Sequence, residues 1–96
     1  MTIYAVLRRP GPAFDPRRPI DEQEAWPAHA AFMTGLAAEG LVLMAGPLMG
    51  EGALLIVRAG TEEEVAARLA DDPWAALDLL GVDRILRWDV RIGAPA

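Results

Sequence analysis

The pattern of hydrophobic and polar positions changes period along the chain, from strand-like to helix-like and back. β-branched and aliphatic residues run from Thr2 to Arg8, and a proline-rich loop, 10–20, follows. Acidic residues then precede a segment with apolar side chains three and four positions apart, which ends before Gly40. The chain is therefore expected to open with a strand, a long loop and a helix that begins near Trp26.

The middle of the chain predicts a hairpin and a second helix. Two apolar runs, Leu41 to Met49 and Ala53 to Val57, flank a short stretch with two turn glycines. Thr61, with Glu64 three residues later, forms a capping box for a helix that ends at the aspartates before Pro73.

Pro73 suits the first position of another short helical piece, Trp74 to Leu80, closed by Gly81. The segment from Arg84 to Ile92 then alternates, with Leu86, Trp88, Val90 and Ile92 on one face. This alternation predicts a last strand with one largely solvent-facing side.

The order strand, helix, strand, strand, helix, strand predicts one α+β domain, residues 1–96, with a ferredoxin-like βαββαβ topology. In that fold, a four-stranded antiparallel sheet carries its helices on one face. The two hairpin strands are apolar on both faces, so a monomer would leave apolar surface uncovered. We expect a homodimer that buries sheet against sheet; the alternative is that the loop from Pro10 to Ile20 folds over this face.

Composition narrows the class of protein further. The chain has 96 residues, of which 53% are hydrophobic and 24% charged, as expected for a folded core. No apolar run is long enough to span a membrane, and the first residues do not resemble a secretory signal. The formal charge of -5 and the scattered arginines oppose binding to nucleic acid. We expect a cytoplasmic protein without nucleic-acid or membrane partners.

The reactive side chains are few. The chain contains no cysteine, serine or lysine, which excludes thiol, serine and Schiff-base nucleophiles. His29 is the single histidine, and it lies on the same predicted helix face as Phe32, Met33 and Leu36. It is either an acid-base group or a core histidine bonded to a backbone carbonyl. A lone histidine without cysteine or a second spaced ligand predicts no metal site, and no cofactor is expected.

A set of short motifs in order along the chain resembles the YCII-related family. The matching pieces are Pro27-Ala28-His29, Leu36, Glu39-Gly40, Ala45-Gly46-Pro47 and Asp72-Pro73-Trp74. The resemblance implies a dimeric ferredoxin-like fold, akin to the dimeric α/β barrels, with a pocket near the subunit interface. It also implies a histidine-aspartate pair, here His29 and Asp72, which in the family has been linked to reactions such as dehydrochlorination of a chlorinated aromatic.

The chain departs from the family pattern at two positions. Trp26 stands where the family commonly has arginine, and Asp78 stands where it commonly has glycine. With Trp26 in place of arginine, the site lacks a cation that could hold an anionic substrate. A flatter or more apolar ligand is therefore favoured. Asp72 also suits the N-cap of the helix after it, and Asp71 is an alternative partner for His29.

Aromatic side chains complete the candidate site. Trp26 and Trp74 are expected to line a pocket for an aromatic ligand, or else to pack in the core or dimer interface. Tyr4, on the first strand, is expected to donate a hydrogen bond into the same cavity, or to face solvent. Two functions remain: a cofactor-independent lyase, isomerase or dehydrohalogenase-like enzyme in which His29 and Asp72 move a proton, and a non-catalytic dimer that binds a small molecule or has an accessory role.

Overall fold

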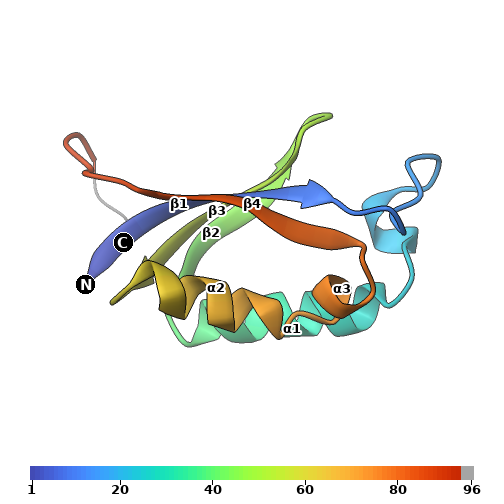
Figure 1. Ribbon diagram of the computed structural model, residues 1–96, viewed down its shortest axis with the longest axis horizontal. Helices are drawn as coiled ribbons and strands as arrows, with labels where there is room; N and C mark the ends of the chain where they lie inside the picture. The colour runs from blue at the N-terminus through green and yellow to red at the C-terminus, as the bar shows by residue number, and fades with distance from the viewer. Residues whose placement is uncertain (94–96) are drawn as a thin grey trace.

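The computed structural model describes residues 1–93 and has one antiparallel sheet with helices on one of its faces (Figure 1). The strands lie in the order β2-β3-β1-β4, and each neighbouring pair is antiparallel. The elements are β1 (Thr2–Pro10), η1 (Ile20–Glu22), α1 (Trp26–Ala38), β2 (Val42–Leu48), β3 (Gly52–Ala59), α2 (Glu62–Ala70), α3 (Pro73–Ala76) and β4 (Leu80–Arg87). This arrangement is the predicted ferredoxin-like order. The predicted domain, 1–96, also includes 94–96, which lie outside the described residues.

The central strand β1 carries an unusual residue on its buried side. Its buried positions are Tyr4, Val6 and Arg8, every second residue of the strand. β1 is hydrogen bonded to β3 along one edge and to β4 along the other, so its register is held from both sides. Arginine is rarely buried without a partner. The strand therefore carries a positive charge into the space between the sheet and the helices.

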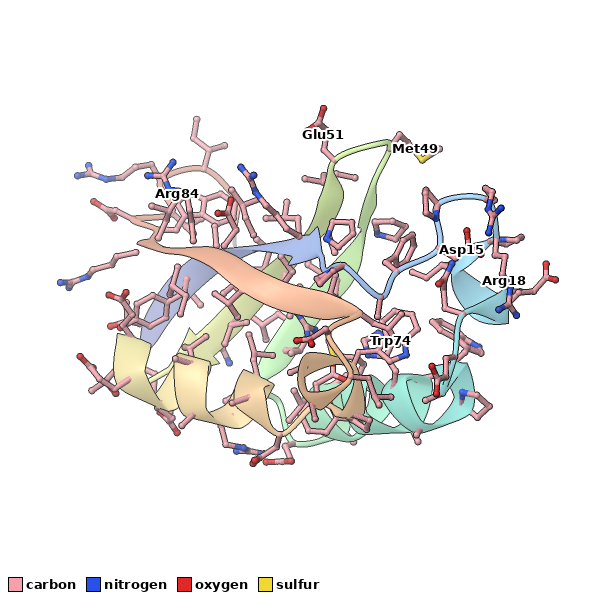
Figure 2. The ribbon with its side chains drawn as sticks, turned by 45° about the vertical axis from the view of Figure 1, so that its right-hand side comes forward. Asp15, Arg18, Met49, Glu51, Trp74 and Arg84 are labelled. Carbon is pink, nitrogen blue, oxygen red and sulfur yellow. The ribbon has the colours of Figure 1, made fainter. Side chains whose placement is uncertain are left out.

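The apolar core of residues 1–93 consists of two clusters. The larger one packs the sheet against α1 and α2, and includes Val6, Leu36 and Val65. The smaller one is built around Trp74, at the end of the molecule where α3 and the loop after β1 meet (Figure 2). Met33 packs against the larger cluster and accepts a contact from Arg8, so the buried arginine lies where the two clusters adjoin.

The two longer helices begin as the sequence indicates. α1 starts at Trp26 after Ala25, whose φ of 58° turns the chain into the helix without a side-chain cap. α2 begins after Thr61, whose hydroxyl accepts a hydrogen bond from the backbone N–H of Glu64 at 3.1 Å. The Glu64 carboxylate in turn accepts the backbone N–H of Gly60 at 2.8 Å. The N-cap role predicted for Thr61 is confirmed, while Glu64 reaches back to the residue before the cap rather than to the cap itself.

The predicted end of the third helix was wrong. The helical piece expected over 74–80 is α3, which ends at Ala76, and Gly81 lies within β4 rather than closing a helix. The turn occurs at Asp78, which has a φ of 59°. The backbone N–H of Leu79 then bonds to the carbonyl of Trp74 at 2.9 Å, which closes the helix in a Schellman motif.

The last strand is also displaced from its predicted bounds, Arg84 to Ile92. β4 begins at Leu80, opposite Pro10, and ends at Arg87, opposite Tyr4. The backbone N–H of Trp88 donates to the carbonyl of Ile3 at 2.9 Å. Residues 89–93 pass the start of β1 and have no strand to pair with among the described residues, which explains why the alternating pattern continues without a ladder.

The sheet face opposite the helices is apolar and open. Four directly paired residues form a row across it: Met44, Ile56, Ala5 and Leu86. Met44 is 64% exposed and the neighbouring Trp88 is 46% exposed. The loop after β1 does not cover this row, because Phe14 packs against the cluster around Trp74 and the loop lies beyond the end of the sheet (Figure 1). The alternative in which the loop from Pro10 to Ile20 folds over this face is therefore wrong.

None of the helices among residues 1–93 has the length and apolar character needed to cross a bilayer. The cytoplasmic location stays a prediction.

Candidate functional site

Asp72 lies in the connection between α2 and α3, where it caps the shorter helix. Its Oδ1 accepts a hydrogen bond from the backbone N–H of Trp74 at 2.9 Å, and Pro73 opens α3. The capping role considered for this residue is therefore present. An ionised carboxylate has about four acceptor sites, so the cap leaves room for further donors.

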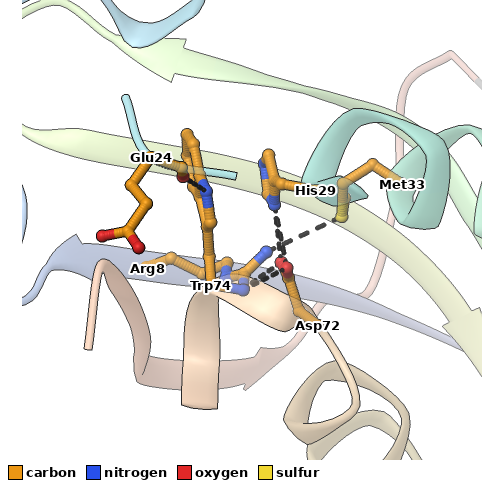
Figure 3. A network of polar contacts seen from close by, with 6 residues as sticks. All are labelled: Arg8, Glu24, His29, Met33, Asp72 and Trp74. Carbon is orange, nitrogen blue, oxygen red and sulfur yellow. Dashed lines mark hydrogen bonds and ion pairs between the residues drawn. The ribbon is translucent and has the colours of Figure 1, made fainter. Parts of the chain in front are cut away.

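The imidazole of His29 is one of those donors. Its Nδ1 lies 2.9 Å from Asp72 Oδ1 and 2.8 Å from Oδ2 (Figure 3). The side chains of the pair are 9% and 0% exposed. The partner of His29 is thus Asp72 and not a backbone carbonyl, while Asp71 is exposed at the surface. A catalytic role for the pair stays a prediction.

Arg8 is a third member of this cluster that the sequence analysis missed. Its Nη2 donates to Asp72 Oδ2 at 2.7 Å, and both side chains are almost completely buried, at 1% and 0% exposure. The signal for it was present in the sequence: Tyr4, Val6 and Arg8 share one face of a strand, so the arginine continues an inward-facing series. A charge at such a position requires a buried counter-charge.

The surroundings of Asp72 favour its ionised form. Burial of the carboxyl by itself raises its pKa. Hydrogen bonds from His29, the backbone N–H of Trp74 and Arg8 act in the opposite direction, and the charge of Arg8 adds to them. Together they hold the pKa of Asp72 below its ordinary value. The carboxylate therefore acts only as a hydrogen-bond acceptor near neutral pH.

This acceptor state determines which nitrogen of His29 carries a proton. Because Asp72 can only accept, Nδ1 must donate, and the neutral ring then has its lone pair on Nε2. Nε2 has no hydrogen-bond partner among residues 1–93. Arg8 Nε is the single buried, unpartnered side-chain nitrogen or oxygen in the same range, so Nε2 keeps contact with solvent. The imidazole is oriented from within, and its outer nitrogen keeps a small exposed surface.

Two tryptophans surround the imidazole. Trp74 stacks on it in parallel, with ring centroids 3.8 Å apart and an interplanar angle of 3°. Trp26 is tilted against both rings, at 5.8 Å from each. Trp74 is completely buried and its Nε1 donates to the carbonyl of Glu24 at 2.7 Å, whereas Trp26 is half-buried. Trp74 therefore holds the imidazole plane, and Trp26 is the ring with surface to offer a ligand.

Tyr4 does not belong to this group. It is buried in the larger core cluster, four residues before Arg8 on the same face of β1, which corresponds to about 13 Å along a strand. The structure thus brings together His29, Asp72, Trp26 and Trp74, and leaves Tyr4 among aliphatic residues. The hydrogen bond expected from Tyr4 to a ligand stays a prediction.

An apolar cavity lies beside this cluster and not over it. Its volume is about 540 Å³, and its walls come from the loop after β1, the β2–β3 hairpin and the start of β4. Trp74 contributes to the wall, while His29 and Asp72 do not. Most of the lining is apolar, with Phe14, Ile20 and Leu48 among the side chains. Trp74 is therefore the residue that connects the imidazole with the cavity.

The arrangement of side chains does not indicate a metal site. Within residues 1–93, histidine, aspartate and glutamate do not gather in groups of three or more that could hold a metal ion. The expectation of no metal and no cofactor stays a prediction.

The fold and the cluster together define the chain as a ferredoxin-like domain with a buried histidine, aspartate and arginine. A family model for the YCII-related domain matches residues 2–89, which include all three residues. The chain belongs to the YCII-related family. A comparison with curated proteins found no match.

Proposed function

We propose that the protein is a cofactor-independent enzyme that moves a proton on a small, planar and largely apolar molecule. The proposal rests on one observation: His29 Nδ1 is bonded to a buried carboxylate while Nε2 has no partner among residues 1–93. An imidazole oriented in this way can accept a proton at Nε2 and return it later. Asp72 holds the ring in place and stabilises the imidazolium that forms.

The reaction class that suits these residues is lyase, isomerase or dehydrohalogenase-like. In an elimination, Nε2 of His29 takes a proton from a carbon next to a leaving group. The electrons of that C–H bond become a double bond, and the leaving group departs with its own bonding pair. In an isomerisation, Nε2 returns the proton to a different carbon. Neither route requires a nucleophile or a redox group from the protein.

The substrate class follows from the charges near the imidazole. Arg8 is the cation in contact with the pair, and its charge is already matched by Asp72 at 2.7 Å. By its resemblance to the YCII-related family, the chain has Trp26 at a position where an arginine is expected. An aromatic or otherwise flat molecule with little negative charge is therefore favoured, with Trp26 as the contacting ring.

We also propose that the functional unit is a homodimer built sheet against sheet. The row Met44, Ile56, Ala5 and Leu86 is apolar across all four strands, and exposed apolar patches of this kind are typical of subunit interfaces. A chain of 96 residues gains stability by burying such a face.

The catalytic proposal is tested with His29→Gln, which keeps a polar side chain of similar reach but cannot serve as a base near neutral pH. Wild-type protein and variant are incubated in D2O with a panel of small phenols, halogenated aromatics and carbonyl compounds, and NMR follows deuterium incorporation and product formation. We expect the variant to lose about 10²–10⁴-fold in rate on any compound that the wild type converts.

Thr34→Val, on the exposed side of α1, is the control and should keep the wild-type rate. Circular dichroism and sedimentation establish that all three proteins share fold and assembly. A variant with His29→Gln that turns over substrate as fast as the wild type would refute the catalytic role.

A second function, binding of a small molecule without catalysis, is favoured by one observation. The cavity of about 540 Å³ is not lined by His29 or Asp72. If the protein binds a small molecule without catalysis, ligands from the same panel should raise the unfolding temperature equally in the wild type and the His29→Gln variant. Neither protein should then convert any compound.

A further inference from the structure

We propose that Arg8 is a positioning residue that keeps His29 uncharged at rest, so that Nε2 is available as a base. This inference extends the proposed function, because it names the residue that sets the resting state of the same site. Arg8 does not contact the imidazole; it acts through Asp72, which both side chains share.

The first step of the argument is the geometry of Arg8. Its Nη2 lies 2.7 Å from Asp72 Oδ2, Nη1 makes a long contact of 3.7 Å to the Met33 sulfur, and Nε is buried without a partner. Asp72 is thus the one strong acceptor of this guanidinium among residues 1–93 (Figure 3). A surface arginine can share its charge among several partners. The charge of Arg8 instead acts on one buried carboxylate.

The second step is the balance of charge in the buried cluster. With Arg8 positive and Asp72 negative, a neutral His29 gives a cluster with no net charge, and a protonated His29 gives one excess positive charge. Without Arg8, the neutral ring leaves an unmatched carboxylate, and protonation of the ring restores balance. Because an unmatched buried charge is costly, Arg8 favours the neutral imidazole.

The third step concerns the other groups around the imidazole. β1 contributes Arg8, α1 contributes His29, and the α2–α3 connection contributes Asp72. Glu24 reaches this region through its backbone carbonyl, which accepts the Trp74 indole N–H. Among residues 1–93, hydrogen bonds and ion pairs to the Asp72 side chain come from Arg8, His29 and the Trp74 backbone. No further charged side chain in that range forms a hydrogen bond or ion pair with the cluster, so Arg8 is the group that decides its balance.

The test uses the fact that the chain has a single histidine. Protein labelled with ¹⁵N in histidine gives one pair of imidazole nitrogen signals, and their chemical shifts distinguish the Nδ1–H form, the Nε2–H form and the imidazolium. We expect the wild type to show the Nδ1–H form at pH 7. In Arg8→Met, the signals at pH 7 should shift toward those of the imidazolium, and Arg8→Lys should restore most of the neutral form.

Arg9→Met is the matched control, because the neighbouring arginine pairs with Asp83 at the surface and should leave the spectrum unchanged. If Arg8→Met does not fold, Arg8→Gln replaces it, since glutamine keeps a hydrogen-bond donor for Asp72 without the charge. A folded neutral variant whose imidazole spectrum equals that of the wild type at pH 7 would overturn the proposal and leave Arg8 a purely structural residue.

The NMR result does not depend on a substrate. An active His29→Gln variant would refute the proposed enzyme while the role of Arg8 in the charge state of the ring stands. An unchanged spectrum in the Arg8 variants would refute only the positioning role. Once a converted compound is known, the acid limb of the pH–rate profile should move to higher pH in Arg8→Met and remain in place in Arg9→Met.

Discussion

Asp72 combines a structural and a chemical role in one side chain. It caps α3 through the Trp74 backbone N–H, accepts the Nδ1 proton of His29 and is the counter-ion of Arg8. Each donor helps to hold the carboxylate ionised in a place where water cannot do so. The cap, often the simplest explanation for an aspartate before proline, is here part of what keeps the candidate base oriented.

The pKa of Asp72 leads to a prediction about acid stability. Because its folded-state pKa is lowered, the carboxylate stabilises the fold above the unfolded-state value of about 4, and this contribution is lost as the pH falls through the folded-state pKa. Asp72→Asn should lower the free energy of unfolding at pH 7 by about 3–5 kcal/mol, since it leaves the Arg8 charge buried without a counter-ion. Urea unfolding at pH 7, 5 and 3 measures this difference.

The difference between wild type and Asp72→Asn should become smaller toward pH 3, because the unfolded wild-type chain takes up a proton on this carboxyl near pH 4 while the folded chain does so only at lower pH. Asp71→Asn, at the exposed neighbouring position, should follow the wild type at every pH. Curves for wild type and Asp72→Asn that remain parallel from pH 7 to pH 3 would contradict the assigned ionisation.

At the scale of elements, α1 and α3 end in the same way although their sequences differ. In α1 the left-handed residue is Gly40, with a φ of 84°, and Leu41 N–H bonds back to the carbonyl of Leu36 at 3.1 Å. In α3 the same position is taken by Asp78. The early stop of α3 brings the chain into β4 at Leu80, and this keeps the Trp74 ring under the sheet.

Asp78 has a φ of 59°, a backbone conformation that favours glycine. Asp78→Gly should stabilise the protein by about 0.5–1 kcal/mol, because glycine adopts positive φ without the steric cost of a Cβ. Asp78→Val should destabilise it by a larger amount. Thermal unfolding of both variants checks this prediction, and a lower melting temperature for Asp78→Gly would contradict it.

The location of Asp78 explains why the sequence misplaced α3. A glycine is the usual marker of a helix end, and Gly81 is the first glycine after Trp74, so the helix was expected to continue to Leu80. The periodicity of the other segments was sufficient for the order of elements, because each has either an apolar stripe or a capping residue. Arg8 was missed for a different reason: its partner Asp72 is distant in sequence, and no local pattern pairs them.

At the scale of the whole molecule, the open sheet face provides the test of assembly. We expect the wild type to sediment as a dimer, and Met44→Glu to shift it to the monomer of 10.3 kDa, because a charge in the middle of the apolar row would be buried against the partner.

Leu77→Glu is the matched control for assembly. Leu77 is 40% exposed at the end of α3, in the helix layer on the other side of the sheet from the row. This variant should remain dimeric. A wild type that sediments as a monomer at tens of micromolar, or a dimer that tolerates Met44→Glu, would exclude the open face as the interface.

The residues of the polar cluster are separated by 43 and 64 positions along the chain. No single hairpin or helix pair contains all of them, so the cluster comes into existence only when β1, α1 and the α2–α3 connection have come together. A nascent chain or a fragment that lacks any of these pieces would be chemically inert. Conversely, any molecule that binds at His29 selects the fully folded state, and it will slow hydrogen exchange across the central strands as well as at the site itself.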